Sequence, residues 1–345
     1  MLERRPALDD SERGELIWAN GVDALADLGL DDAVRAAGKG LEDEDFRSWR
    51  GGALYRVPVR ELAEAAGRSQ PTVVRRRDLL RVLFDALPDR TVRFGAEATG
   101  VEQEHGAVTV TSADGAIERG DVLLAADGAR SRMRTTALDG PYAHIAPGTW
   151  AYGVCAFPDR GLTSGRTLLA LGRGDRFLVR DLGNGSASWL AVVADGHPVS
   201  RERLLERFRA FSSPVPALIA STPPEAIRTE DVRWVDALDT WHDGAVVLLG
   251  DAAHAASPTL ARGAGEALID ASLLGALLTE RGVDGGIAAY VDERKGKTAS
   301  VQAEAQRIER IFNLRSPVAV PLREQVMRRV LSRGVAKRIG AELRS

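Results

Sequence analysis

The spacing of apolar residues along the chain predicts a mixture of helices and strands. Apolar positions recur near helical spacing over 10–38 and 75–88, and Pro88 is expected to end the second of these helices. Residues 46–59 indicate a hairpin around two adjacent glycines, and 92–117 alternates in the manner of strands. These segments therefore indicate a mixed α/β chain.

Two short apolar runs predict buried strands that end at an aspartate. Residues 122–126 run into Asp-Gly, and residues 245–249 run into Gly-Asp and are typical of a buried parallel strand. A loop rich in proline and glycine follows the second run, and a helical pattern over 266–280 comes after it. An acid at a strand end beside a glycine-rich helix start suits a cofactor that carries hydroxyls and a polar, electron-rich group.

The pattern changes between 141 and 240, where strand-like pieces are separated by Gly, Asp and Asn turns. A helix at 199–211 interrupts them, and 297–345 is again helical in pattern, with Pro317 and Pro321 expected to break the run. We therefore expect an antiparallel sheet inserted between two parts of a nucleotide-binding domain. The strand-like pieces are 150–157, 167–171, 176–179 and 187–193.

Length and composition narrow the class of protein. A chain of 345 residues suggests about two domains, and 44% apolar with 28% charged residues is ordinary for a soluble globular protein. The net charge of −3 gives no bulk attraction to nucleic acid or to an anionic membrane. The single cysteine, Cys155, rules out an internal disulfide and fits a reducing cytoplasm. We expect a cytoplasmic protein with no nucleic-acid partner and no membrane span, since no run approaches ~18 apolar residues.

Three motifs carry a resemblance to a known family. They are Gly-Asp-Ala-Ala-His at 250–254, Ala-Asp-Gly-Ala-Arg-Ser at 126–131 and Arg-Arg-Asp-Leu at 76–79. In sequence, order and spacing they resemble the motifs of single-component FAD-dependent monooxygenases, the aromatic hydroxylase and epoxidase superfamily. Each motif is weak alone, but the three together are specific and span most of the chain.

The resemblance implies a fold and a division of the chain. The expected fold is α/β, a Rossmann-like FAD/NAD(P)-binding domain, truncated at its N-terminus, with an inserted antiparallel-sheet substrate domain and C-terminal helices. The implied parts are 1–140, the first part of the FAD-binding domain with a substrate-domain hairpin near 46–59; 141–240, the substrate domain; 241–295, the second part of the FAD-binding domain; and 296–345, a helical segment.

The resemblance also implies a set of FAD ligands. Asp251 would bind near the ribityl chain or pyrophosphate, Arg76 the phosphates, and Glu3 the adenosine ribose. Backbone amides at 263–265 would face the flavin ring, where negative charge collects on reduction. No catalytic side chain and no metal ligand is implied, because the cofactor carries the chemistry. The implied cofactor-binding residues are Glu3, Arg4, Arg76, Val101, Asp127, Gly128, Gly250, Asp251, Pro258, Gly263, Ala264 and Gly265.

Several of these residues also have a purely structural interpretation. Asp251 could cap the next turn, Asp127 could cap an Asp-Gly turn, and Arg76 could lie in a solvated basic turn. Arg262 stands where relatives carry Gln and could lie near the flavin or point to solvent. His254 is expected to be structural.

Four aromatic residues of the inserted sheet are candidates to line a substrate pocket between that sheet and the flavin loop, and each could instead be plain core. They are Trp150, Tyr152, Phe177 and Trp189.

For activity, the resemblance implies that NADH or NADPH reduces FAD and that the reduced flavin forms a C4a-hydroperoxide with O2. The distal oxygen would pass to a small organic substrate, either an aromatic ring or an alkene. Two alternatives remain: a flavin-dependent reductase of the same fold, and a truncated, inactive remnant that binds FAD poorly. The sequence does not indicate an oligomeric state.

The Gly-x-Gly-x-x-Gly turn of the family is not found in this sequence. Gly172-Arg-Gly174 and two similar pairs begin such a turn without completing it, and 1–6 resembles the end of the family's second strand. We expect the first βα unit and part of the second strand to be missing, and a misplaced start codon is our hypothesis for this. In-frame upstream DNA encoding the missing unit would support it, and a stop codon directly upstream would contradict it.

Overall fold

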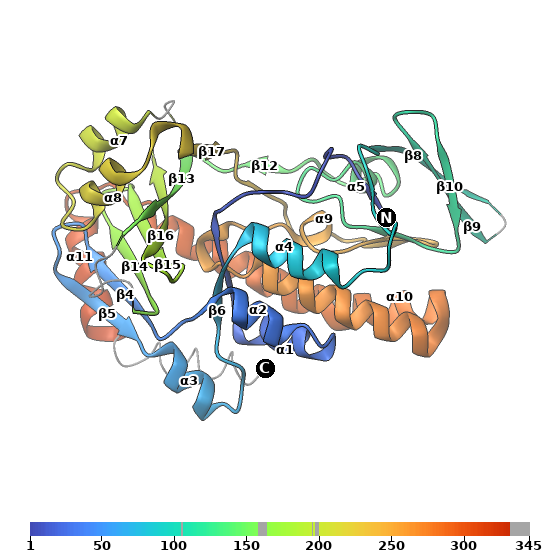
Figure 1. Ribbon diagram of the computed structural model, residues 1–345, viewed down its shortest axis with the longest axis horizontal. Coiled ribbons are helices and arrows are strands. Elements are labelled where there is room, and N and C mark those ends of the chain that lie inside the picture. The colour runs from blue at the N-terminus through green and yellow to red at the C-terminus, as the bar shows by residue number, and fades with distance from the viewer. Residues whose placement is uncertain (105, 158–163, 195, 197–199, 332–345) are drawn as a thin grey trace. The chain divides into compact units, whose positions relative to one another are not determined.

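The computed structural model describes residues 1–104, 106–157, 164–194, 196 and 200–331, and it confirms a mixed α/β chain. The chain divides into two compact units, each assembled from stretches that lie far apart in sequence (Figure 1). Unit 1 comprises 1–9, 80–146 and 232–307, and unit 2 comprises 10–79, 147–231 and 308–345. The functional division of the chain into FAD-binding and substrate parts stays a prediction.

Unit 2 is built on a seven-stranded sheet in the order β17-β13-β16-β15-β14-β4-β5. Neighbouring strands are antiparallel except β4 and β14, which pair in parallel. The expected antiparallel strands and the expected hairpin, β4–β5, are both present, and the hairpin joins the sheet along β14. The strands are β4 Asp43–Ser48, β5 Ala53–Val57, β13 Thr149–Ala156, β14 Arg166–Leu171, β15 Arg176–Asp181, β16 Ser186–Val193 and β17 Arg228–Glu230.

One face of this sheet forms the main core of unit 2. Helices α7 Arg201–Phe208 and α8 Val215–Ser221 cover this face (Figure 1). Phe177 and Trp189 are 0% and 1% exposed there, with ring centroids 5.3 Å apart. The interpretation of these two residues as plain core is therefore confirmed, and neither lines a pocket. The helix expected at 199–211 is α7, although residue 199 lies outside the described residues.

A smaller three-stranded sheet, β2-β6-β3, completes the strands of unit 2. Leu16 and Ile17 are buried in β2, which pairs antiparallel with β6. The prediction of one helix over 10–38 is therefore wrong at its start, because a strand partner far along the chain buries these residues. The remaining elements of unit 2 are β2 Gly14–Ile17, β3 Lys39–Gly40, β6 Thr72–Arg75, α1 Ala19–Asp27, α2 Asp31–Ala37, α3 Val59–Ala65, the 3-10 helix Pro224–Ala226, α11 Ala319–Val326 and the short π-helix Met327–Leu331.

Unit 1 contains the short strands that lead to the aspartate motifs. β11 Leu123–Ala125 and β20 Val246–Leu248 pair in parallel, as do β1 Leu2–Glu3 and β7 Arg93–Phe94. β20 is buried as predicted, whereas Leu124 in β11 is 44% exposed. The expected burial of β11 is wrong because this strand is the edge of the sheet β11-β20-β19.

The strands expected over 92–117 and their tight turn at Gly115, with φ +82°, are confirmed. The other elements of unit 1 are β8 Ala98–Glu104, β9 Ala107–Ser112, β10 Ile117–Gly120, β12 His144–Ile145, β18 Arg233–Trp234, β19 His242–Asp243, α5 Arg132–Thr136, α9 Asp251–His254 and the 3-10 turn Pro258–Leu260. α4 Arg76–Asp85 begins in unit 2 and ends in unit 1, which confirms the helix expected over 75–88.

The helix expected over 266–280 is the start of α10 Gly263–Phe312. Among the described residues, no helix is long and apolar enough to cross a membrane. α11 begins after Pro317, as expected. Pro321, however, lies within the first turn of α11, where backbone amides have no partner inside the helix, so proline loses no hydrogen bond there. The prediction that Pro321 breaks the helix is therefore wrong. The remainder of the expected C-terminal helix, 332–345, lies outside the described residues.

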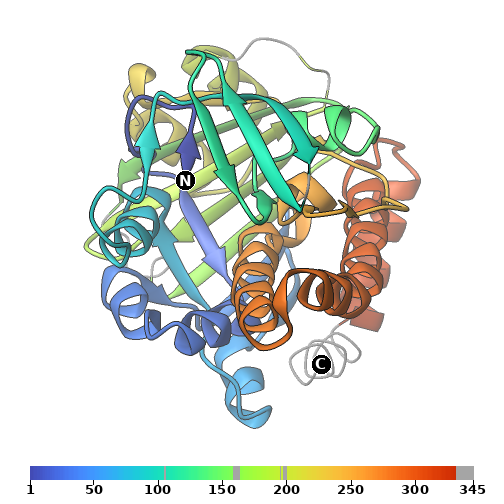
Figure 2. The ribbon, with the colours of Figure 1, turned by 90° about the vertical axis from the view of Figure 1, so that its right-hand side faces the viewer.

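α10 turns back on itself at Gly282, whose φ of +70° is outside the helical region (Figure 2). The two halves approach closely at Gly286. A Cβ atom at this residue would lie 2.9 Å from the carbonyl oxygen of Leu277 and 2.9 Å from the Cα atom of Leu278. Only glycine allows this approach, so Gly286 fixes how the second half of α10 packs on the first.

We expect Gly286→Ala to lower the free energy of unfolding by about 1–3 kcal/mol, because the added methyl group meets backbone atoms that cannot rotate away. Gly275→Ala in the same helix is the matched control, since nothing lies within 4 Å of a Cβ atom there. The control should be neutral or stabilising by up to about 1 kcal/mol. Denaturant titration of both variants tests this, and equal stabilities would contradict the close-packing argument.

Candidate cofactor-binding site

The end of β20 and the start of α9 form a corner at Gly250 and Asp251. Gly250 adopts φ +58° and ψ −140°, a conformation that favours glycine. Gly250 is the N-cap of α9 and Asp251 is the first residue of the helix, so Asp251 does not occupy the capping position. Its side chain is exposed, and Asp251 Oδ1 lies 3.7 Å from the position of a Cβ atom on Gly263. The structure thus places the acid of one motif beside the helix start of the next.

The N-terminal end of α10 supplies backbone donors at the same corner. Pro258 opens a 3-10 turn, and Ala261 then adopts the left-handed conformation with φ +52° before α10 begins. The first amides of a helix have no carbonyl partner within it and carry its positive dipole end. The range 263–265 contains two glycines, so little side-chain bulk covers these amides. An exposed carboxylate beside the first amides of a helix fits a cofactor with hydroxyls and an electron-rich ring, as FAD has.

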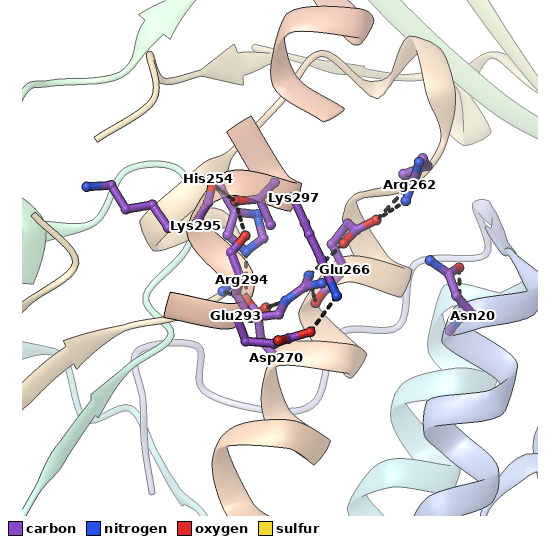
Figure 3. Close-up of polar contacts among 12 residues, drawn as sticks. Asn20, His254, Arg262, Glu266, Asp270, Glu293, Arg294, Lys295 and Lys297 are labelled. Carbon is purple, nitrogen blue, oxygen red and sulfur yellow. Dashed lines mark hydrogen bonds and ion pairs between the residues drawn. The ribbon is translucent and has the colours of Figure 1, made fainter. Parts of the chain in front are cut away.

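A buried network of charged residues holds this corner together (Figure 3). Asp270 is 0% exposed, and its Oδ2 atom accepts hydrogen bonds from the amide of Gly250 at 2.8 Å and from His254 Nε2 at 2.6 Å. Arg294, from the second half of α10, donates Nε to Asp270 Oδ1 at 2.7 Å and Nη2 to Glu266 Oε2 at 2.6 Å. One network thus connects the strand end, α9 and both halves of α10.

The charges in this network stabilise one another. Burial acts to raise the pKa of Asp270, but the hydrogen bond from His254 and the positive charge of Arg294 outweigh it and hold that pKa below its usual range. Burial acts to lower the pKa of Arg294, but the charge of Asp270 and the hydrogen bond to Glu266 hold it above its usual range. Asp270 and Arg294 are therefore both ionised, and His254 is structural, as expected.

Arg262 pairs with the same network. Its Nη2 and Nε atoms donate to Glu266 Oε1 at 2.6 and 3.0 Å. Its positive charge near the helix start is therefore offset by Glu266, and Arg262 neither stands as a free charge nor points only to solvent. Arg262, Glu266 and Asp270 recur every four residues, so helical spacing was the signal that could have revealed this part of the network in the sequence.

The Asp127-Gly128 motif forms a capped turn. Asp127 Oδ2 accepts from the amides of Arg132 and Met133 at 2.8 and 3.1 Å, at the start of α5. Gly128 has φ +78°. The capping interpretation of Asp127 is therefore confirmed. The Asp127 side chain is also exposed, and its contact with a cofactor stays a prediction.

Arg134 ties this turn to the Gly-Asp corner. Its side chain is 1% exposed and donates to the carbonyl oxygens of Ala129, Pro141 and Ala252 at 2.8, 2.9 and 2.8 Å. Ala252 directly follows Asp251, so one buried guanidinium fixes the two aspartate motifs with respect to each other.

Of the remaining predicted ligands, Glu3, Arg4 and Val101 lie in unit 1 and Arg76 lies in unit 2. Leu2, next to Glu3, and Val101 both pack on an apolar cluster that β9 and Val246 of β20 form. Glu3 Oε1 accepts from the amide of Arg5 at 2.8 Å, and Arg4 is exposed. Arg76 belongs to unit 2, where its Nη1 atom donates to Glu15 Oε1 at 3.3 Å. Its role as a phosphate ligand stays a prediction.

Comparison with known proteins identifies the family of the chain. A family model described as "FAD binding domain" matches residues 1–140 and 195–305. The Aurachin C monooxygenase/isomerase of Stigmatella aurantiaca is 32% identical over 338 residues, covering 96% of this chain and 88% of that protein. The salicylate hydroxylase of Pseudomonas putida is 29% identical, covering 95% and 83%. The structure of Klebsiella pneumoniae HpxO complexed with FAD and uric acid has the same fold, with a TM-score of 0.90 at 24% identity over 99% of this chain and 89% of that one.

Fold, site and comparisons together define an FAD-dependent oxidoreductase. The chain belongs to the FAD-dependent monooxygenase family that contains the aromatic hydroxylases.

We expect Arg294→Gln to lower the free energy of unfolding by about 3–5 kcal/mol, because it removes the positive charge that pairs with two buried carboxylates. Lys297→Gln is the matched control. Lys297 also forms an ion pair on α10, with Glu293, but both side chains of that pair are more than half exposed, so the loss should stay below about 1 kcal/mol. Thermal and denaturant unfolding measure both. A loss at Arg294 no larger than at Lys297 would contradict the role of the network.

Proposed function

We propose that this protein is a monooxygenase that uses FAD, NADH or NADPH, and O2 to hydroxylate or epoxidise a small organic substrate, aromatic or alkene. The observation that carries the proposal is the corner at Asp251 and Gly263, where an exposed carboxylate lies beside the N-terminal end of α10. Two relatives, one named a monooxygenase and the other a salicylate hydroxylase, support the proposal, since each matches nearly the whole chain.

The proposed ligands follow from this corner. Asp251 accepts hydrogen bonds from cofactor hydroxyls, and the amides of 263–265, beside Pro258, donate toward the flavin ring. Glu3, Arg4 and Val101 are assigned to the adenosine end, and Asp127-Gly128, Gly250 and Arg76 to the central part of FAD. We assign 1–140 and 241–295 to a Rossmann-like FAD-binding part and 141–240 to the substrate part.

When bound, FAD would supply the redox chemistry, accepting a hydride from NADH or NADPH and activating O2 at its C4a position. One oxygen atom enters the substrate and the other leaves as water, with two electrons from the nicotinamide and one proton from solvent. The chain's own residues bind and orient the cofactor, and the α10 dipole stabilises negative charge on the reduced ring.

The first test is the visible absorption of the purified chain after incubation with FAD and desalting. We expect retained flavin bands, and then oxidation of NADH or NADPH with transfer of isotopically labelled oxygen from O2 to product. Product that forms without label would favour a reductase. A protein that stays colourless and inactive would contradict the proposal.

Asp251→Asn should weaken FAD binding by roughly 10–100-fold, because a charged hydrogen bond to a hydroxyl contributes about 1.5–3 kcal/mol. Asp284→Asn is the matched control, an exposed aspartate on α10. Flavin fluorescence titration gives both dissociation constants. Equal dissociation constants for Asp251→Asn and the control would contradict the proposal that Asp251 binds FAD.

A further inference from the structure

The outer face of α11 in unit 2 carries a row of exposed aliphatic side chains. Val318, Leu322 and Val326 are 78%, 60% and 45% exposed, and their spacing of four residues places them on one side of the helix. Nine large apolar side chains are exposed among the described residues, and three of them fall within this short stretch, whereas exposed apolar residues are normally scattered singly. We call these three residues, together with the exposed Pro317 and Pro321, the α11 stripe.

The opposite face of α11 attaches the helix to the core of unit 2. Val320, Arg323 and Met327 are buried on that face, and Met327 belongs to the same apolar cluster as Phe312. Arg323 donates Nη1 to the carbonyl oxygen of Phe312 at 3.1 Å and Nη2 to that of Gly172 at 2.9 Å. The helix is therefore held by its inner face, and the α11 stripe lies on the surface.

Arginines border the α11 stripe at both ends. Arg315 precedes the helix, and its Nε atom lies 3.2 Å from the position of a Cβ atom on Gly174, in the turn between β14 and β15. Arg328 follows the helix and donates Nε to the carbonyl oxygen of Ala53, at the start of β5, at 3.2 Å. The turn before β5 and the turn before β15 each carry an exposed arginine as well. The exposed basic residues around the stripe are Arg50, Arg173, Arg315, Arg328 and Arg329.

The acids of this region are turned inward. Glu309 and Glu324 are the acidic residues of 308–329, and neither is exposed. Glu309 accepts from the buried Arg176 at 2.7 Å, and Glu324 accepts from a serine hydroxyl of β4 at 2.7 Å. By sequence alone, 332–345 add four basic residues and one acid. The surface around the stripe is therefore basic, although the whole chain has a net charge of −3.

The chemistry of this surface favours an anionic lipid bilayer over a protein. A second copy of the chain would bring two sets of arginines together, and like charges across an interface repel. Binding energy between proteins is concentrated in aromatic residues and arginine, whereas the apolar part of the stripe is purely aliphatic. Helices that bind to a membrane surface combine an apolar face with long basic side chains that reach the headgroups.

We infer that the α11 stripe and the arginines around it bind the surface of an anionic membrane. The aliphatic side chains enter the boundary between headgroups and acyl chains, and the guanidinium groups donate to lipid phosphates. Attachment is local, because it depends on one basic end of unit 2 and not on the charge of the whole chain. This inference goes beyond the proposed function and does not depend on it.

The first experiment measures sedimentation of the full chain, with FAD added, together with vesicles. One set of vesicles is phosphatidylcholine alone, and the other contains about 30% phosphatidylglycerol, which supplies the negative surface charge. We expect binding to the anionic vesicles to be at least about tenfold tighter, and to weaken when salt is raised to about 0.5 M because screening shortens the reach of the arginines. Equal binding to the two sets, or no binding to the anionic set, overturns the inference.

Leu322→Gln and Arg329→Gln test the apolar and the basic part of the surface separately. Each should weaken binding to the anionic vesicles by about fivefold or more, while thermal unfolding stays unchanged because both side chains are exposed. Ile117→Gln and Arg119→Gln are the matched controls, an exposed apolar residue and an exposed arginine on β10 of unit 1, on either side of the exposed Glu118. Unchanged binding in either α11 variant, or equal losses in the controls, overturns the inference.

Two other occupants of the stripe would give different results. A second copy would show by light scattering as a dimer that Leu322→Gln converts to a monomer, without binding to anionic vesicles. An acidic protein would show as binding to polyglutamate, again without binding to vesicles. Either result overturns the inference, and neither bears on the proposed function, which is tested by labelled product.

Discussion

Two carboxylates one helical turn apart, Glu266 and Asp270, are buried at the start of α10, and the site depends on their neutralisation. Arg294 supplies the positive charge, and it reaches both acids only because α10 turns back at Gly282. Asp270 then has a free lone pair to accept the amide of Gly250, and that bond fixes the backbone at the corner where Asp251 emerges. The backbone that carries Asp251, the proposed FAD ligand, is thus held in place by a buried ion pair that does not include Asp251 itself.

The sequence was a good guide wherever a feature is local. A glycine beside an aspartate at a strand end, a proline-rich loop and a glycine-bearing helix start are neighbours in the chain, so their pattern predicted the corner. The pairing of Asp270 with Arg294 was not predicted, because it depends on a reversal in a helix that carries no proline at the turn. Leu16 and Ile17 were assigned to a helix because their strand partner, β6, lies far along the chain. Phe177 and Trp189 could not be separated from pocket residues until the register showed which face each strand presents.

The two sides of the large sheet in unit 2 differ in composition, because residues alternate between the sides along each strand. Trp189 and its neighbours fill the side under α7 and α8, where every position is needed for packing. On the other side, successive rows across the strands change from polar to apolar within two residues. Both sides take part in packing, since Leu169 and Leu171 on this other side belong to a buried cluster with Phe312.

The interleaved path of the chain has a consequence for its folding. The hairpin β4–β5 can form early, but the parallel edge of β4 has no partner until β14 has been synthesised. Phe312 belongs to the cluster that covers Leu171, and Arg294 completes the core of unit 1, so neither unit has all its contacts until the ribosome has made nearly the whole polypeptide. During synthesis the emerging chain presents an open strand edge, which is the kind of surface that chaperones bind and that aggregation exploits. Both units therefore gain their stability late and within a short interval, rather than one domain after the other from the amino end.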